Sequence, residues 1–145
     1  MRATQQLRYA IYGIFDLAYN GGSRPVRIQE IGQRQGIPAR YLEQIFQRLR
    51  RAGLVASKRG PGGGYMLARP AAEIRLADVI VAVEGSLLSA TGGAPPASAA
   101  PSFVWELMQR SMSDALESIT VASLCREAAQ RGLRRSEAEP PMYEI

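Results

Sequence analysis

The chain has 145 residues, the length of one ordinary domain, and 46% of them are apolar, which is enough to form a hydrophobic core. Its 18 basic and 13 acidic residues leave a formal net charge of +5. It has no histidine and a single cysteine, Cys125. These absences exclude a Ser-His-Asp or Cys-His catalytic site, a zinc finger and a disulfide framework within one chain, and they predict that the protein is not an enzyme.

Neither a targeting signal nor a membrane span is predicted. Charged residues, among them Arg2, Arg8 and Asp16, interrupt the first apolar stretch, so it lacks the core of a signal peptide. The longest uncharged stretch, between Glu84 and Glu106, is rich in Gly, Ala, Ser and Pro, which is typical of a linker. We therefore expect a cytoplasmic protein with no membrane partner.

The positive charge is concentrated in the first half of the chain. Residues 1–85 hold 13 basic and 6 acidic residues, a balance of +7, whereas residues 86–145 hold 5 basic and 7 acidic residues, a balance of −2. Lys58 is the only lysine, and the planar fork of arginine suits phosphates and guanine edges. This asymmetry predicts a nucleic-acid-binding half followed by a half with another task.

Three helices are predicted in the first 51 residues. Helical spacing of apolar residues over 7–18 indicates the first helix, which ends at the Asn-Gly-Gly sequence 20–22. A short second helix carries Ile28 and Ile31 and ends at Gly36. The third begins at Pro38, where a first helical turn tolerates proline, and ends before Gly53.

The third helix has one apolar stripe, formed by Leu42, Ile45, Phe46 and Leu49. Its other faces carry side chains that can read base edges or hold phosphates. Taken alone, these side chains favour the simpler interpretation of an ordinary solvent-exposed helix face.

The next segment favours the DNA-binding interpretation. Residues 54–57 and 65–67 read as two short strands, and the cationic, glycine-rich sequence 58–64 between them predicts a hairpin. A phosphate-binding loop is excluded, because no Gly-Lys-Ser/Thr sequence opens a helix here. A basic hairpin after a helix-turn-helix is a winged helix, whose third helix enters the major groove.

The second half is predicted to be helical. Leu76, Val79, Ile80 and Val83 form a short amphipathic helix that completes the first domain, residues 1–85. Residues 86–102 form a loop, residues 103–132 hold a long helix and a last helix capped by Thr120, and residues 133–145 form a flexible tail. The fold class is therefore mainly α, a winged helix-turn-helix with a small β-hairpin plus a long C-terminal dimerisation helix.

The long helix has two candidate roles, packing on its own domain and pairing with a second subunit. The residues on which these roles depend recur along it at intervals of three and four positions. The predicted dimerisation residues are Val104, Leu107, Met108, Ser111, Met112, Ala115 and Ile119.

The sequence of the third helix and hairpin resembles the Rrf-two family of bacterial winged-helix transcription factors. The resemblance rests on Tyr-Leu-Glu-Gln-Ile-Phe at 41–46, Leu-Arg at 49–50, Gly-Leu-Val at 53–55 and Lys-Arg-Gly-Pro-Gly-Gly-Gly-Tyr at 58–65. It is densest over residues 7–85, where it is nearest to the IscR-like members. It implies a homodimeric, DNA-binding transcriptional regulator, here interpreted as a repressor, that binds a partly palindromic double-stranded operator.

The resemblance also implies roles for particular residues. Glu43 and Gln44 would face bases in the major groove, and Arg59 would enter the minor groove. The expected DNA-binding residues are Arg40, Tyr41, Glu43, Gln44, Gln47, Arg48, Arg51, Lys58, Arg59, Gly60, Gly62, Gly63 and Gly64.

The chain departs from the family in the sensor loop. Relatives that bind an iron–sulfur cluster carry three cysteines before the long helix, and some add a histidine. Residues 90–102 of this chain contain neither, and Ser102 falls at the histidine position when Trp105 is aligned. Iron–sulfur clusters need thiolate or imidazole ligands. We therefore expect no cofactor and no metal site.

Two features suggest another signal. Cys125 is either a redox-sensing thiol or a buried apolar residue. The C-terminal residues Tyr143, Glu144 and Ile145 resemble peptides that dock in cysteine synthase, which implies a cysteine-metabolism regulator of the CymR type with that enzyme as partner. A protein-interaction module that no longer reads DNA is a further class, against which the intact cationic hairpin argues.

Overall fold

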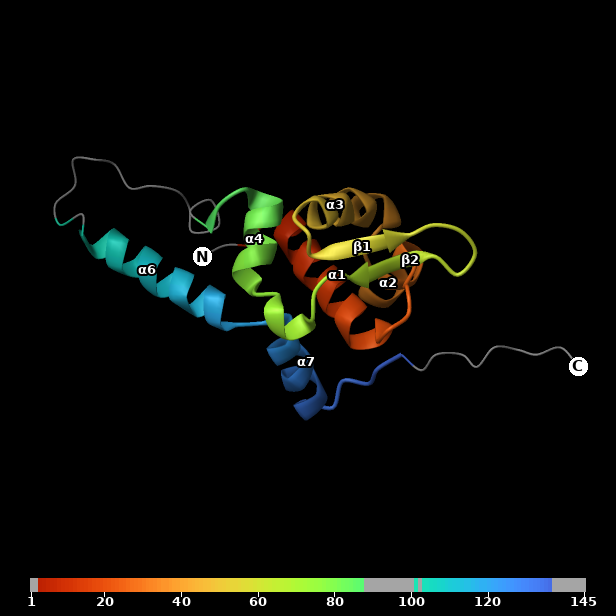
Figure 1. The fold of residues 1–145 in the computed structure, drawn as a ribbon. Coiled ribbons are helices and arrows are strands. Elements are labelled where there is room, and N and C mark those ends of the chain that lie inside the picture. The colour runs from red at the N-terminus through yellow and green to blue at the C-terminus, as the bar shows by residue number, and fades with distance from the viewer. Residues whose placement is uncertain (1–2, 88–100, 102, 137–145) are drawn as a thin grey trace, which may run out of the picture.

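A winged helix-turn-helix is followed by further helices (Figure 1). The computed structural model describes residues 3–87, 101 and 103–136. The elements in chain order are α1 (Gln5–Gly21), α2 (Ile28–Gln35), α3 (Ala39–Arg51), β1 (Val55–Lys58), β2 (Gly64–Leu67), a 3-10 turn (Ala71–Glu73), α4 (Leu76–Glu84), α6 (Phe103–Ser118) and α7 (Val121–Gln130). The predicted fold class is confirmed.

The first domain is built around α1 and the apolar stripe of α3. Thr4 caps α1, its hydroxyl accepting a hydrogen bond from the backbone N–H of Leu7 at 3.1 Å. Ile14 of α1 and Phe46 of α3 are both fully buried. A Cβ at Gly13 would lie 2.8 Å from the Phe46 ring, so a residue without a side chain lets the two helices approach closely.

The wing is an antiparallel hairpin that is attached to the helices. Val55 pairs with Leu67 and Lys58 with Gly64. Tyr65 of β2 also pairs with Val26, with N–H to oxygen distances of 2.9 and 2.7 Å. A Cβ at Gly64 would lie 2.4 Å from the Val26 carbonyl oxygen, so glycine permits this bridge. The bridge fixes the direction of the wing relative to the start of α2.

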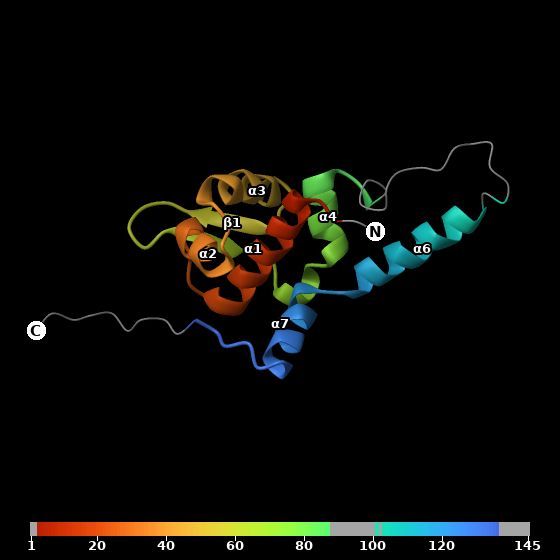
Figure 2. The ribbon, with the colours of Figure 1, turned by 180° about the vertical axis from the view of Figure 1, so that it is seen from behind.

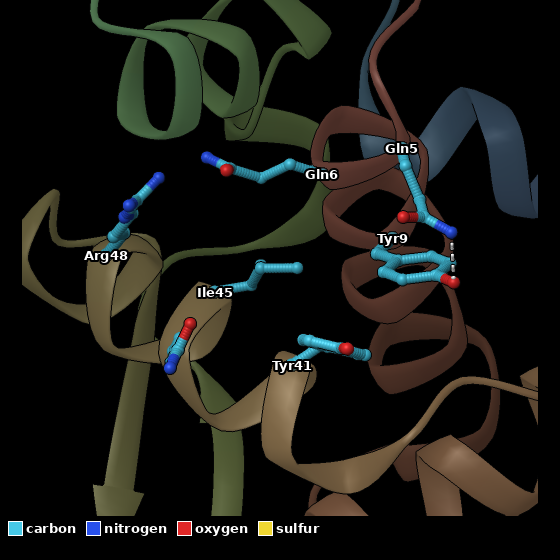
Figure 3. Close-up of a pocket in the computed structure, with 7 residues that line it drawn as sticks. Gln5, Gln6, Tyr9, Tyr41, Ile45 and Arg48 are labelled. Carbon is cyan, nitrogen blue, oxygen red and sulfur yellow. Dashed lines mark hydrogen bonds between the residues drawn. The ribbon is translucent and has the colours of Figure 1, made fainter.

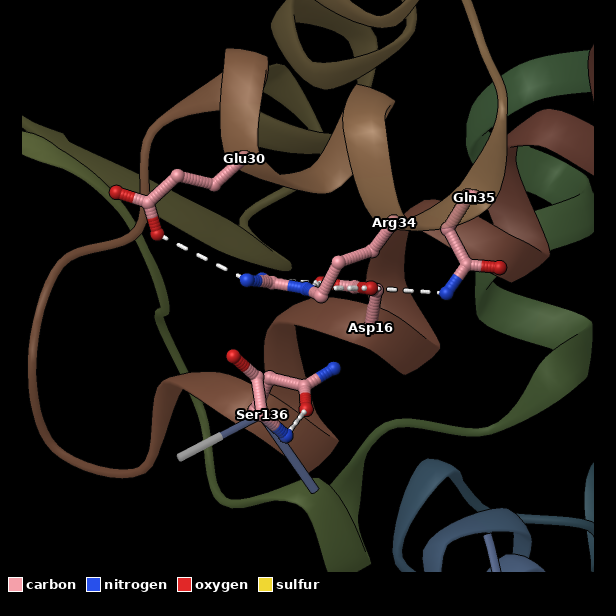
Figure 4. Close-up of polar contacts among 6 residues, drawn as sticks. Asp16, Glu30, Arg34, Gln35 and Ser136 are labelled. Atoms are coloured by element: carbon pink, nitrogen blue, oxygen red, sulfur yellow. Dashed lines mark hydrogen bonds and ion pairs between the residues drawn. The ribbon is translucent and has the colours of Figure 1, made fainter. Parts of the chain in front are cut away.

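An ion pair between a buried carboxylate and a partly exposed arginine joins α1 to α2 (Figure 4). The side chain of Asp16 is fully buried, and Arg34 donates to both of its carboxylate oxygens, the shortest distance being 2.7 Å. Gln35 donates to the same carboxylate at 2.8 Å. The hydrogen bond to Asp16 raises the pKa of the Arg34 guanidinium. The carboxylate thus has several donors, which a buried charge requires.

The long helix α6 packs against α4 of its own domain. Leu116 is its buried residue, and it packs with Leu7, Ala77 and Ile80 of α1 and α4. The predicted stripe did not include it. Ile119 was assigned to the helical stripe, which is wrong, because α6 ends at Ser118 and the Ile119 carbonyl accepts a hydrogen bond from Leu76.

The last helix is capped as predicted. The Thr120 side chain accepts a hydrogen bond from the Ser123 N–H, and the Ser123 hydroxyl oxygen accepts one from the Thr120 N–H, both at 3.0 Å. Among residues 3–87, 101 and 103–136, no helix combines the length and apolar character that a bilayer crossing needs.

The segment after α7 returns to α1 (Figures 1 and 2). The Tyr19 hydroxyl donates to the Leu133 carbonyl, the Arg135 guanidinium lies 5.0 Å from the Tyr19 ring centroid, and the Ser136 N–H donates to Asn20 at 2.6 Å. Residues 133–136 were assigned to a flexible tail. The structure instead places them on α1, because α1 offers them polar and aromatic partners. Residues 137–145 lie outside the described residues.

Candidate nucleic-acid interface

The exposed side of α3 divides into an outward face and two flanks. Successive residues of an α-helix are turned by about 100°, so the four buried positions of the stripe fix where the others point. Arg40, Gln44, Gln47 and Arg51 lie opposite the stripe, and all four are exposed. Most of the polar positions predicted on α3 therefore form one continuous face.

The wing-side flank of α3 leads into the hairpin. Glu43 lies on this flank, and Arg50 donates to the Ser57 hydroxyl of β1 at 3.4 Å. Lys58 and Arg59 are exposed, and neither has a carboxylate partner within the described part of the chain. The two cations of the wing are thus free to neutralise phosphates.

The other flank of α3 faces α1 and α4 and carries Tyr41 and Arg48 (Figure 3). A cavity of about 170 Å³ lies here. Arg48 donates to the Val83 carbonyl of α4 at 3.3 Å, and Gln6 of α1 donates to the same oxygen at 3.1 Å. The ring of Tyr41 lies 6.4 Å from that of Tyr9. Arg48 therefore has a structural contact, and these two predicted residues lie apart from the wing.

Glycines of the wing have different roles. Gly60 and Gly62 are exposed and have φ angles of 92° and 73°, a region that glycine adopts without strain. Gly63 is half-buried, and a Cβ there would lie 2.3 Å from the Lys58 carbonyl oxygen. Gly63 and Gly64, both predicted to contact DNA, therefore have a clear part in forming the hairpin itself.

The start of α2 belongs to the same surface, which the sequence interpretation missed. Arg27 and Gln29 line a cavity of about 270 Å³ together with Glu43 and Gln47 of α3 and the beginning of β2. Arg27 is exposed and directly precedes α2. The sequence did contain a signal for this part of the surface, namely a cation directly before a helix, because helix N-termini favour phosphate.

Cys125 lies on α7, half-buried against the core of the first domain. Burial raises the pKa of its thiol, which keeps it protonated. The arrangement is that of an apolar core residue. Tyr143, Glu144 and Ile145 lie outside the described residues, as do residues 88–100 and 102 of the predicted loop.

The architecture and the cationic face define a winged helix-turn-helix protein. A family model named Rrf2 and described as "Iron-dependent Transcriptional regulator" matches residues 3–127. The chain belongs to the Rrf2 family of transcriptional regulators, the Rrf-two family identified above. The prediction of a regulator rather than an enzyme is thereby confirmed.

Individual relatives agree with this assignment. A Neisseria meningitidis serogroup A protein named as an HTH-type transcriptional regulator is 42% identical over 132 residues, which cover 86% of this chain and 87% of that protein. IscR of Cronobacter sakazakii is 52% identical over 87 residues, 60% of this chain and 54% of that regulator.

Solved structures extend the likeness over the whole chain. The IscR of T. potens superimposes with a TM-score of 0.77 at 35% identity, covering 99% of this chain and 97% of that one. CymR of B. subtilis, the global cysteine regulator, gives the same TM-score of 0.77 at 28% identity, covering 88% of this chain and 98% of that one.

The residues of this chain do not fit the iron that the family description implies. The described residues contain no group of three or more His, Cys, Asp or Glu side chains that could hold a metal ion. The full sequence has no histidine and one cysteine, and residues 88–102 contain no Cys, His, Asp or Glu. A cluster needs several thiolate or imidazole ligands, which one chain here does not offer.

Proposed function

We propose that this Rrf2-family regulator binds a specific, partly palindromic DNA operator as a homodimer, without an iron–sulfur cluster, and represses transcription in the cytoplasm. One observation carries the proposal. The outward face of α3, the unpaired cations of the wing and Arg27 at the start of α2 lie together on one exposed surface. Glu43 is the one carboxylate among these side chains.

The physical roles differ along this surface. The arginines and Lys58 neutralise phosphates, which makes the affinity fall with salt. Gln44 and Gln47 on the outward face have the donors and acceptors that adenine edges match, and Glu43 can accept a hydrogen bond from cytosine. Arg59 is placed on the wing, from which a cation reaches the minor groove.

The homodimer is supported by α6. Leu107 and Met108, two residues of the predicted stripe, are exposed by 54% and 48%. Leu116, on another face of the same helix, is buried against α1 and α4. One side of α6 therefore packs on its own domain, while the stripe is available to a second copy, which would bury it as a helix pair. Two-fold symmetry would place two α3 helices on half-sites about one helical turn apart.

The experiment is selection from a random duplex DNA pool on the purified protein, reduced and treated with a chelator. We expect enrichment of a partly palindromic site by the metal-free protein. Arg59→Ala should weaken binding to that site by about tenfold, which corresponds to ~1.4 kcal/mol. Arg126→Ala, which removes an exposed arginine on α7, is the matched control and should leave affinity unchanged.

Base reading is tested separately from affinity. Glu43→Ala should relax the preference at one position of the selected site while other positions keep theirs. An unchanged preference at every position would contradict the role of Glu43. No enrichment by the metal-free protein would contradict cluster-independent binding.

A cysteine-metabolism regulator that acts with cysteine synthase is a second candidate. Two observations favour it, the likeness to CymR of B. subtilis and the sequence Tyr-Glu-Ile at 143–145. Deletion of Ile145 should then abolish co-purification with a cysteine synthase. Unchanged co-purification would contradict docking through this residue.

A further inference from the structure

A separate cavity lies on the side of α1 that is away from α3. Its volume is about 310 Å³, and it is lined by the last turns of α1, the end of α2 and residues 133–136. In Figures 1 and 2, α3 lies along the upper edge of the molecule and the segment after α7 along the lower edge, with α1 between them. The lining includes no residue of α3 or of the wing, so the cavity is distinct from the proposed DNA surface.

The cavity has an excess of positive charge. Asp16 is the one carboxylate in its lining, and Arg34 neutralises it through the bidentate pair described above. Arg134 and Arg135, which also line the cavity, have no carboxylate partner within the part of the chain that the structure describes. Two guanidinium groups are therefore available to an anion, which each can bind in a bidentate manner.

The remaining lining supplies donors and a ring surface. Asn20 uses its carbonyl oxygen to accept from the Ser136 N–H, and the two N–H groups of its amide have no acceptor among the described residues. The Phe15 and Tyr19 rings are stacked with centroids 5.2 Å apart, and Phe15 is half-buried. Figure 4 shows Ser136 below the Asp16–Arg34 pair, so polar groups of the C-terminal segment and of α2 both lie near the last turns of α1.

We propose that this cavity binds a small organic anion that carries an aromatic ring. Its carboxylate or phosphate would pair with Arg134 and Arg135, and its ring would lie against Phe15. The size supports an organic body, because a cavity of about 150 Å³ already holds benzene, and this one is twice as large. An inorganic ion would leave most of it empty.

Such a ligand would join the C-terminal segment to α1 next to the residues that hold α2. Arg34 and Gln35, which end α2, both contact Asp16 at the edge of the cavity. The bound anion is thus placed to act on the position of α2 in the helix-turn-helix. An effect of the anion on DNA binding rests on the proposed DNA-binding function, whereas binding of the anion to the cavity does not.

The test is a titration of the full-length, ¹⁵N-labelled protein followed by NMR, without DNA. Benzoate and phenyl phosphate are the two anionic probes, benzamide has the ring without the charge, and acetate has the charge without the ring. We expect at least one of the two aromatic anions to shift the backbone amides of Asn20 and Ser136. Benzamide and acetate should bind at least tenfold more weakly, and the better of the two anions identifies the head group.

A pair of variants localises the site. Arg134→Gln should weaken binding of the better probe by about tenfold. Arg126→Gln removes the same charge from an exposed arginine of α7 and should have no effect. Both residues are exposed, so both variants should fold, and a thermal melt checks this.

Three results would overturn the proposal: no shift at Asn20 and Ser136 with either anion, equal binding of benzamide, or wild-type affinity in Arg134→Gln. Shifts confined to α3 and the wing would also overturn it, since they would report anion binding on the DNA surface. Loss of DNA binding with a normal titration would contradict the proposed function alone.

Discussion

The winged-helix half and the helix α6 use their apolar side chains in opposite ways. In the first half, Ile14, Phe46 and Leu49 are completely buried among α1, α3 and the wing. On α6, Leu116 is buried, whereas Phe103 and Leu107 are exposed by 59% and 54%. The first half therefore buries its apolar residues in a core, whereas α6 leaves apolar side chains exposed in the described part of the chain.

The charges follow the same division. The first half carries the excess of arginine, and the structure gathers much of it on the face formed by α3 and the wing. The second half carries little net charge but exposes apolar residues. Phosphates attract cations, whereas a subunit interface excludes water, so these two surfaces suit the DNA binding and the self-association proposed above.

The largest effect on stability is expected in the core of the first half. Phe46→Ala removes a ring that is 0% exposed and packs edge-on to Tyr65 at 5.0 Å. The free energy of unfolding should fall by roughly 3–5 kcal/mol. Urea denaturation followed by circular dichroism measures this. Tyr12→Ala, which removes a ring that is 49% exposed on α1, is the control and should change little. Equal losses would contradict the assignment of the core.

A smaller loss is expected at the ion pair between α1 and α2. Asp16→Asn removes the charge that Arg34 faces while keeping the shape of the side chain. Because Arg34 is partly exposed, we expect a loss of about 2 kcal/mol, less than for a fully buried pair. Chemical denaturation of Asp16→Asn, Arg34→Gln and the double variant gives the coupling free energy between the two side chains. Independent, additive losses would show that the pair does not act as a unit.

The exposed stripe of α6 is tested by measuring the self-association of the protein. Leu107→Glu places a charge in the exposed stripe, and the dimer dissociation constant should rise at least tenfold, by ~1.4 kcal/mol or more. Sedimentation velocity over a range of concentrations measures it. Gln109→Glu adds the same charge on the same helix outside the stripe and serves as the control. If both variants associate like the wild type, the stripe is not the interface.

The smallest effect is expected at Cys125. Its raised pKa means that the folded protein favours the protonated thiol. Below the ordinary thiol pKa, the contribution of Cys125 to the free energy of unfolding therefore does not change with pH. Stability should then be lost relative to Cys125→Ser as the pH rises from the ordinary thiol pKa through the raised pKa of the folded state. Thermal melts of both proteins across neutral and alkaline pH test the sign. Release of DNA by oxidant in the wild type but not in Cys125→Ser would instead indicate a thiol sensor.

Local patterns explain how much of the fold was predictable. Apolar spacing over 7–18 and in the stripe from Leu42 to Leu49 predicted α1 and α3, and the glycine-rich sequence 58–64 predicted the hairpin between β1 and β2. Differences at the ends are small, as at Pro38, which precedes α3 rather than lying in its first turn. These signals are readable because they arise from interactions between residues close in sequence.

Long-range contacts account for what was missed. Ile119 fitted the spacing of the stripe, but its carbonyl pairs with Leu76 and α6 ends before it. Leu116 is buried by residues of α1 and α4, and Arg27 lines a cavity with residues of α3. In both cases the contacting helices are distant in sequence. Residues 133–136 read as a tail because their composition is polar, and their partners Tyr19 and Asn20 lie more than a hundred residues earlier.

The sequence by itself therefore determined the class of protein, the order of its helices and hairpin, the placement of its positive charge and the lack of cluster ligands, all of which depend on composition and local spacing. The tertiary structure decided which cations share a face, which side of α6 is free and where the C-terminal segment returns. Those features depend on which distant residues meet when the core closes, and no local pattern records that.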